Sequence, residues 1–288
     1  MWAFQRSDSF EPKLAIGLWL ISIKENMNVF ELSFKALMCG DINEKIERVD
    51  QIQLLKNTQG LNFQSSYPIK PVEFPGRPSK PNLVRFQSIP QRNKTDLGMI
   101  KTIHAICHIE FNAINLALDA VYRFRKMPDQ FYQDWIQVAF EESKHFQLLN
   151  NHLIELGYQY GDFDAHNGLW KMTHETDYDV LARMALVPRV LEARGLDATP
   201  KIQKRFKDAH FDKMVNLLDI IFNDEIGHVK IGNFWFHYLC KARQLDPIEA
   251  FDGFIKKHIG EQLRGPFNLE ARKLANFNQD ELNYLKAL

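Results

Sequence analysis

Apolar residues recur at intervals of three and four positions along most of this chain, a spacing that predicts amphipathic helices. Helical patterns cover one N-terminal stretch and four further long stretches, over about 28–55, 99–124, 130–156, 177–194 and 209–242. Shorter helices are expected at three further places, over 198–207, after Asp246-Pro247 and after Asn268. No stretch of comparable length alternates as a strand does. The pattern therefore predicts an all-α fold.

Three features interrupt the helical pattern between residues 157 and 200. The segment through His166 and Trp170 is expected to be a loop, and Gly195 is expected to end the third long helix as its C-cap. Pro188 lies inside that helix, where a proline removes a backbone hydrogen bond. We therefore expect a kink or a bulge four residues before Glu192.

A proline-rich segment separates the N-terminal helices from the four long ones. Six of the twelve prolines lie between Gln59 and Gly98, and the basic residues there exceed the acidic ones by four. We interpret this segment as an extended strap packed on the domain, with contact to phosphate as the alternative. The predicted organisation is an N-terminal extension, N-terminal helices with the strap, a four-helix bundle and C-terminal helices, over 1–26, 27–98, 99–242 and 243–288.

The N-terminal extension contains a ten-residue apolar run, Leu14–Ile23. It is shorter than the roughly 20 residues that a bilayer-spanning helix needs, and no small-residue cleavage site follows it. The run is either a packed segment or part of a stretch upstream of the natural start, in which case residues 1–26 are dispensable. We expect no association with a membrane.

Composition narrows the classes of function. Lys and Arg number 36 and so do Asp and Glu, which argues against a strongly basic nucleic-acid binder and against an acidic disordered chain. The three cysteines, Cys39, Cys107 and Cys240, form no C-x-x-C motif. This excludes zinc ribbons, thioredoxin motifs and a four-cysteine iron centre within the chain. An odd, sparse set of thiols fits a cytoplasmic location.

Acidic residues interrupt the apolar stripes of all four long helices. Each helix carries one glutamate in the middle of its apolar face, and two of these glutamates have a histidine three positions later. The six residues are Glu110, Glu142, His145, Glu192, Glu225 and His228.

Burying four unpaired carboxylates would be prohibitively unfavourable, so positive charge is expected between them. Six nitrogen and oxygen ligands with four negative charges neutralise two divalent cations. Glutamate and histidine at i and i+3 share a helical face and reach the same metal ion. A Glu from each of two helices and Glu-x-x-His from each of the other two is the dimetal ligand set of ferritin-like bundles.

Neighbouring polar residues have other expected roles. Glu141 and Asp224 each precede a Glu-x-x-His motif, so they are rotated about 100° off the ligand face and should matter less than the ligands. Arg189 is the evident basic residue near Glu192, either beside the metal ligands or exposed. His152 either lines the same cavity or is structural.

The remaining histidines have structural explanations. His104 and His108 fall off the stripe of Glu110 and are expected to be satisfied structural groups. His166 and His174 are expected to be loop residues without a visible partner.

The sequence around these residues resembles a bacterial family of ferritin-like proteins known only as a domain of unknown function. The resemblance covers about 27–242 and rests on six segments, His108-Ile109-Glu110, 141–146, 191–197, 224–229, Pro75-Gly76-Arg77-Pro78 and 160–163. More distantly, the ligand set is similar to that of rubrerythrins and of the di-iron tRNA hydroxylase that oxidises a prenylated adenosine beside the anticodon. The resemblance implies a ferritin-like four-helix bundle and a carboxylate-bridged di-iron site, but no substrate.

Three functions stay open on the sequence alone. The first is a non-haem di-iron oxidoreductase or hydroxylase that uses O₂ or peroxide, holds two ions of iron or manganese, and needs an external electron donor or reductase. Its substrate would be a small molecule or a modified nucleoside. The second is a ferroxidase or iron-handling protein, and the third is a structural helical protein with a non-redox metal site. The sequence does not indicate an oligomeric state.

Overall fold

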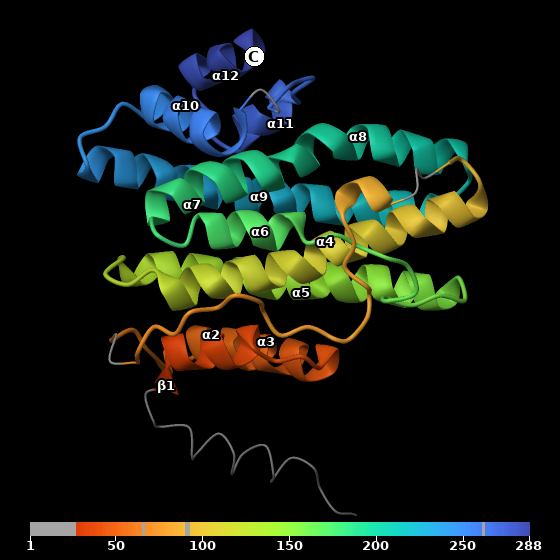
Figure 1. The fold of residues 1–288 in the computed structure, drawn as a ribbon, viewed down its shortest axis with the longest axis horizontal. Coiled ribbons are helices and arrows are strands. Elements are labelled where there is room, and N and C mark those ends of the chain that lie inside the picture. Colours follow the sequence, from red (N-terminus) through yellow and green to blue (C-terminus); the bar gives the residue numbers. More distant parts are fainter. Residues whose placement is uncertain (1–26, 65–66, 90–92, 261–262) are drawn as a thin grey trace, which may run out of the picture.

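The computed structural model describes residues 27–64, 67–89, 93–260 and 263–288, and almost all regular structure in these ranges is helical (Figure 1). The prediction of an all-α bundle is confirmed. The apolar run Leu14–Ile23 lies outside the described residues, and so does the rest of 1–26. In the described ranges, no helix is both long enough and apolar enough to cross a membrane.

Two helices form the N-terminal layer, α2 (Val29–Leu37) and α3 (Ile42–Asn57). The stretch predicted as helical over 28–55 therefore consists of two helices, in agreement with the N-terminal helices expected there. The second helix starts anew because the side chain of Asp41 caps it, accepting a hydrogen bond from the amide of Glu44. Two short parallel strands, β1 (Met27–Asn28) and β2 (Leu61–Asn62), join the ends of this layer.

A buried lysine fastens the N-terminal layer to the bundle. Lys45 Nζ donates hydrogen bonds to the carbonyls of Ala36 and Leu37, at 2.8 and 2.9 Å, and to Asn115 Oδ1 on α4 (Asp96–Arg123), at 2.7 Å. The last carbonyls of a helix have no intrahelical donor, so the amine satisfies the end of α2. Burial lowers the pKa of Lys45 to about 7.

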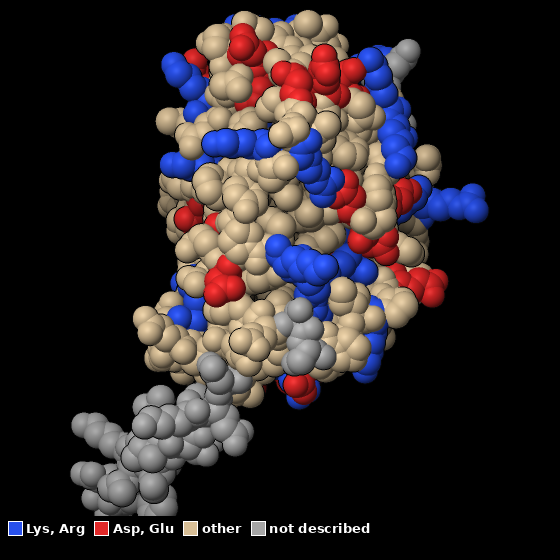
Figure 2. All heavy atoms as spheres, turned by 90° about the vertical axis from the view of Figure 1, so that its left-hand side faces the viewer, with Lys and Arg blue, Asp and Glu red and all other residues tan. Residues whose placement is uncertain are grey.

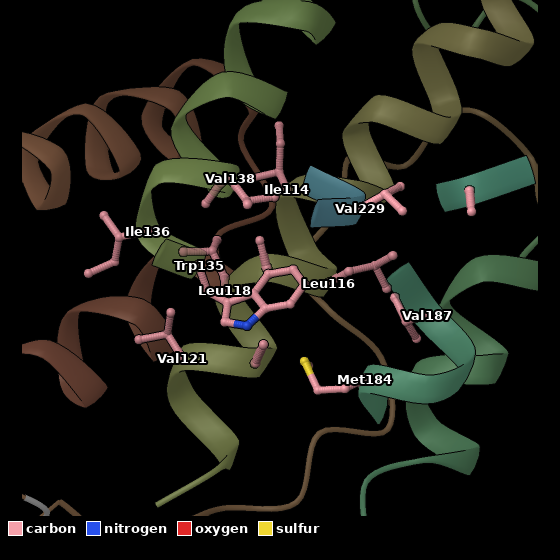
Figure 3. Packing of buried hydrophobic residues seen from close by; sticks show 14 of the residues in the cluster. Ile114, Leu116, Leu118, Val121, Trp135, Ile136, Val138, Met184, Val187 and Val229 are labelled. Atoms are coloured by element: carbon pink, nitrogen blue, oxygen red, sulfur yellow. The ribbon is translucent and has the colours of Figure 1, made fainter. Parts of the chain in front are cut away.

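The bundle itself is built from α4, α5 (Asp129–Glu155), α7 (Val180–Leu186) with α8 (Ala193–Asp208), and α9 (Asp212–Ala242). Helix α4 packs along α5, and α9 packs against α5, α7 and α8. Figure 3 shows buried apolar side chains from these helices meeting in one core. They include Leu116, Leu118, Trp135, Met184 and Val229.

The third segment of the bundle continues through two expected breaks. Helix α7 passes into the π-helical turn η2 (Val187–Glu192), which confirms the bulge expected from Pro188, and then into α8. The end predicted at Gly195 and the separate helix over 198–207 are both wrong. Pro200 lies inside α8 and leaves the carbonyl of Leu196 without its helical donor; the side-chain amide of Asn268 donates to that carbonyl instead, at 3.1 Å.

A short helix, α6 (Gly168–Glu175), replaces most of the loop predicted through His166 and Trp170, so that prediction is wrong from Gly168 onward. Trp170 is buried, and its Nε1 donates a hydrogen bond to the carbonyl of Glu73, at 2.8 Å. Burial of this large indole against the proline-rich segment explains why the chain forms an ordered helix here.

The proline-rich segment between β2 and α4 contains one short 3₁₀ turn, η1 (Phe86–Ser88), within its described residues. Leu83 pairs as an isolated bridge with Ala165, and the hydroxyl of Tyr122 on α4 contacts the backbone of Lys70. The described parts of the segment therefore contact the bundle at these points, as expected for a packed strap.

Three further helices close the C-terminal side of the bundle: α10 (Pro247–His258), α11 (Leu269–Leu274) and α12 (Gln279–Ala287). The side chains of Asp246 and Asn268 cap α10 and α11, as the sequence predicted. Helix α10 packs against α7 and α9, and α11 packs against α8 and α9 (Figure 1). The C-terminal helices thus cover the segment that contains η2.

Charged side chains are mixed over the surface. Figure 2 shows one end of the molecule, where basic and acidic side chains both occur among uncharged ones and neither sign covers the face. This distribution agrees with the formal net charge of zero. The visible face therefore has no single-sign field of the kind that attracts nucleic acid.

We predict that Gly232→Ala destabilises the protein, because a Cβ there would lie 2.2 Å from Cβ of Pro188 in η2. Overpacking of this kind raises the free energy of the folded state by about 1–3 kcal/mol. Gly227→Ala on the same helix is the matched control, since its Cβ would meet no described atom within 4 Å apart from its own stretch of helix. Urea unfolding followed by circular dichroism measures both, and equal stability of the two variants would contradict the packing argument.

Candidate metal centre

The four helical segments bring the six sequence-predicted residues to one buried region. Glu110 lies on α4, Glu142 and His145 on α5, Glu192 at the end of η2, and Glu225 and His228 on α9. Ligand atoms of four of them all lie within 4.8 Å of one another; these are Glu110, Glu142, His145 and Glu225. This cluster of carboxylates and an imidazole can hold a metal ion.

Glu142 lies between the two histidines. Its Oε1 is 2.9 Å from Nδ1 of His228, and its Oε2 is 3.4 Å from Nδ1 of His145. The Nδ1 atom of His145 is also 3.4 Å from Oε2 of Glu110, while that of His228 is 3.7 Å from Oε2 of Glu225. One carboxylate therefore faces both imidazoles, each with a different oxygen.

Glu192 is buried beside this group but is not among the four residues that meet within 4.8 Å. Neither of its carboxylate oxygens has a hydrogen-bond partner in the part of the chain that the structure describes. Burial raises its pKa well above the ordinary value, and the negative charges of Glu225 and Glu142 raise it further. Glu192 is the last residue of η2, so the π-helical turn determines which way its side chain points.

Two outer carboxylates hold the histidines in a crosswise arrangement. Nε2 of His145 on α5 lies 3.0 Å from Oδ2 of Asp224 on α9, and Nε2 of His228 on α9 lies 2.9 Å from Oε2 of Glu141 on α5. A carboxylate accepts only, so each Nε2 carries the proton and donates. In a neutral ring with its proton on Nε2, the lone pair is on Nδ1. Nδ1 faces the inner carboxylates, and this is the arrangement found in metal-binding histidines.

Sequence reasoning placed Glu141 and Asp224 off the ligand face, and they do lie outward, with side chains 27% and 42% exposed. It missed their hydrogen bonds to the histidines. The available clue was that both Glu-x-x-His motifs have an acid directly before them, an arrangement whose purpose becomes visible only when the two helices pack together.

Unsatisfied buried atoms concentrate in this region. In the described part of the chain, eighteen buried side-chain nitrogen and oxygen atoms make no hydrogen bond, and eight of them belong to the six predicted residues. They include both oxygens of Glu142, both oxygens of Glu192 and Nδ1 of each histidine. Buried polar atoms are rarely left without a partner, so these eight fit the ligand atoms of a metal site.

A second buried acid in the same bundle is neutralised differently. Asp119 on α4 is fully buried and accepts hydrogen bonds from Arg123 and Arg183, at 2.6–3.0 Å. The glutamates of the cluster around Glu142 have no arginine or lysine partner of this kind among the described residues. Positive charge at this cluster must therefore come from the two histidines or from a bound cation.

The ionisation of the cluster is strongly perturbed. Burial and the negative charge of Glu142 raise the pKa values of Glu110 and Glu225. Burial alone would lower the pKa of His145, but the hydrogen bond to Asp224 and the nearby carboxylates of Glu110 and Glu142 raise it to about 12. Burial opposes the ionisation of Glu142 as well, yet the charge of His228 holds the pKa of Glu142 below its ordinary value. The carboxyl groups with raised pKa values therefore hold protons more tightly than ordinary glutamates do, and a bound cation would compete with those protons.

Other polar residues named above lie outside the cluster. Arg189 is buried, yet it does not pair with Glu192: its guanidinium reaches Glu281 on α12, at 2.7 Å, and Asn233 on α9. The expectation that Arg189 lies beside the metal ligands or is exposed is therefore wrong. His152 faces Glu155, with Nδ1 3.3 Å from Oε2, and is not part of the metal-ligand group.

The histidines near Glu110 are satisfied structural groups, as expected. Nδ1 of His108 lies 2.8 Å from the hydroxyl of Tyr160, and Nε2 of His104 accepts from the amide of Gly161 at 2.9 Å. The expectation that His166 has no partner is wrong, because its Nδ1 accepts a hydrogen bond from the backbone amide of Gly168, at 3.1 Å.

Comparison with known proteins gives a family and no activity. Residues 38–283 match the family model described as "Protein of unknown function (DUF455)". A Haemophilus influenzae protein described as "Uncharacterized protein" is 46% identical over 261 residues, which cover 87% of this chain and 91% of that protein. No solved structure matches.

We predict that metal binding releases protons. The carboxyl groups with raised pKa values hold their protons to higher pH than ordinary glutamates do, and Mn²⁺ competes with those protons, so each bound Mn²⁺ should displace on the order of one proton. The affinity should accordingly increase as the pH rises from about 6 to 8. Calorimetry in buffers of different ionisation enthalpy measures the protons released, and the Glu192→Gln variant should release fewer. A pH-independent affinity without proton release would contradict the ionisation described above.

Proposed function

The chain belongs to the DUF455 family, and we propose that it is a ferritin-like, non-haem di-iron protein that catalyses an oxidation dependent on O₂ or peroxide. The proposal rests on one observation above all. Eight buried ligand atoms without hydrogen-bond partners, from six residues on four helical segments, face one region between the helices. Four carboxylates and two imidazoles are the donor set expected for two ions of iron or manganese.

The position of each residue supports a division of the ligands. Glu110 and His145 approach each other on one side of Glu142, while Glu225 and His228 approach each other on the other side. In the proposed site, Glu142 would help to hold both ions, because its two oxygens face different histidines. Glu192 completes the second half of the site, next to Glu225.

Two iron ions in such a site supply one-electron redox chemistry and activate O₂ or peroxide. The protein's own contribution is to hold the ligands and to exclude water. Asp224 and Glu141 keep the proton on Nε2 of the histidines and fix the orientation of both rings. Ile114, Val138 and Val229, which Figure 3 shows in the apolar core, lie within four residues of a ligand on their helices and are fully buried. A dry surrounding of this kind protects a reactive oxidant from solvent.

The described residues supply no electron-transfer centre of their own. Cys39, Cys107 and Cys240 are free and lie on separate elements or in a turn. The proposed activity therefore needs an external electron donor or reductase. The substrate belongs to the proposal only as a class, a small molecule or a modified nucleoside.

We expect the full-length protein, expressed in iron-supplemented medium, to hold about two transition-metal ions per chain. Replacing any ligand by alanine should lower this content, because the remaining carboxylates are then under-neutralised whenever metal is lost; the variants are Glu110→Ala, Glu142→Ala, His145→Ala, Glu192→Ala, Glu225→Ala and His228→Ala. Metal analysis after gel filtration gives the result. Less than one ion per chain after reconstitution of the wild type would refute the dimetal site.

The outer carboxylates provide a finer comparison in the same assay. Glu141→Gln and Asp224→Asn should weaken metal affinity roughly 10- to 100-fold, since loss of an outer partner disorders the ring that it holds. This is a larger effect than their outward position alone suggested. Glu155→Gln is the matched control, because Glu155 contacts a histidine on the same helix but outside the cluster. Equal losses in all three variants would point to a general effect of charge.

We also expect the reduced iron form to react with O₂ once, and to turn over repeatedly only when an electron donor is added. The reason is that the free cysteines on the described elements cannot store electrons as an iron–sulfur centre does. Oxygen consumption with and without a chemical reductant tests this. Repeated oxidation of added Fe²⁺ without a donor would instead establish the ferroxidase alternative.

A further inference from the structure

The π-helical turn η2 is held from outside by the C-terminal helices. The guanidinium of Arg189 in η2 packs over three aromatic rings, at 4.2–4.7 Å from their centres. The rings belong to Phe236, Phe251 and Phe277. Its Nη2 donates to Glu281 on α12, at 2.7 Å, which is a buried, charge-assisted bond.

A second buried arginine reaches the backbone of the same turn. Arg272 on α11 forms a two-pronged pair with the carboxylate of Asp197 on α8, at 3.0 and 2.6 Å. The same guanidinium lies 3.5 Å from the carbonyl of Arg189 and 3.4 Å from that of Ala193. These two carbonyls stand on either side of Glu192 in the sequence, so Arg272 spans the backbone that carries this residue.

Further hydrogen bonds connect the two segments. Asn233 accepts from Arg189 with its Oδ1 and donates with its Nδ2 to the carbonyl of Ala275, at 2.8 Å. The amide of Asn268 donates to Asp197, also at 2.8 Å. Side-chain and backbone groups of residues 268–281 thus form hydrogen bonds with residues 189–197.

This fastening matters because a π-helical turn is rarely stable on its own. It holds one residue more than the equivalent α-helical turn, and each residue turns the helix by about 100°. If η2 rewound as α-helix, Glu192 would rotate away from Glu225 and Glu142 by about that angle. Pro188 and its close packing on Gly232 favour the bulge at one end, and the arginines hold it at the other.

We propose that Arg189 and Arg272 are positioning residues that keep Glu192 directed at the second metal position, so that the C-terminal helices α11 and α12 are part of the metal site. This inference rests on the proposed function, because it concerns how a ligand of the proposed dimetal centre is held. It assigns the two arginines no contact with metal or substrate.

The experiment compares full-length Arg272→Gln and Glu281→Gln with a matched control, Arg183→Gln. Arg183 is equally buried and pairs with a buried acid, but its partners lie on α4 and around the end of α6. Anaerobic titration with Mn²⁺ alone measures the two affinities. Electron paramagnetic resonance shows whether the two Mn²⁺ ions form an exchange-coupled pair, a signature that general loss of stability does not remove.

The wild type is expected to bind two Mn²⁺ ions as a coupled pair. Arg272→Gln and Glu281→Gln should bind the second ion roughly 10- to 100-fold more weakly, with the first affinity unchanged. Arg183→Gln should melt at a lower temperature and keep the pair. If Arg272→Gln does not fold, the nearly isosteric Glu281→Gln decides alone.

The proposal is overturned if the second Mn²⁺ affinity in Glu281→Gln equals that of the wild type. It is also overturned if Arg183→Gln weakens the second ion as much as the C-terminal variants do, since the effect would then be one of general stability. A wild type that binds fewer than two Mn²⁺ ions would instead overturn the proposed function itself.

Discussion

The burial of four carboxylates in an apolar bundle is the constraint on which the rest of this structure depends. Each would be far more stable in water, so the fold is tenable only with positive charge or protons at the same place. Asp119 shows one solution, with two arginines donating directly to it. The cluster around Glu142 follows another: it has two histidines, unsatisfied ligand atoms and raised carboxyl pKa values. The difference between the two acidic groups is the strongest argument that the second is built for a cation.

Much of the outer structure serves the placement of these groups. The helices contribute one glutamate each, but only three of the four lie on regular α-helix; Glu192 depends on the π turn that Pro188 initiates. Close packing of Pro188 on Gly232 brings this turn against α9, four residues from His228. The C-terminal helices then cover the outer side of the turn. A minimal four-helix bundle would leave the carbonyls around Glu192 without these partners.

The sequence predicted the helical class and the six clustered residues because both follow from local periodicity. A glutamate in the middle of an apolar stripe is conspicuous whatever the tertiary packing. The sequence predictions were wrong where a group far away in the chain changes the local structure. The helix continues through Pro200 because the side-chain amide of Asn268, far along the chain, donates to the carbonyl of Leu196, which the proline leaves without a helical donor. Arg189 pairs with Glu281 and not with Glu192. The sequence does not reveal this partner, because nothing in it links the helix of Glu281 to the site. The bonds of Glu141 and Asp224 likewise require knowledge of how α5 and α9 pair.

The crosswise bonds of those two acids connect the chemistry of the site to the register of the bundle. Apolar side chains alone permit neighbouring helices to slide with small losses, because volume and patterning matter more than individual contacts. Here His145 on α5 is held by an acid of α9, and His228 on α9 by an acid of α5. A shift of one helix along the other would break both bonds at once and misalign both imidazoles. Since the outer acids are partly exposed and the inner ones buried, each histidine joins the solvent-facing layer to the interior. The same two side chains therefore fix the pairing of α5 with α9 and orient the donor atoms between them, so the geometry of the proposed site and the packing of the fold cannot vary independently.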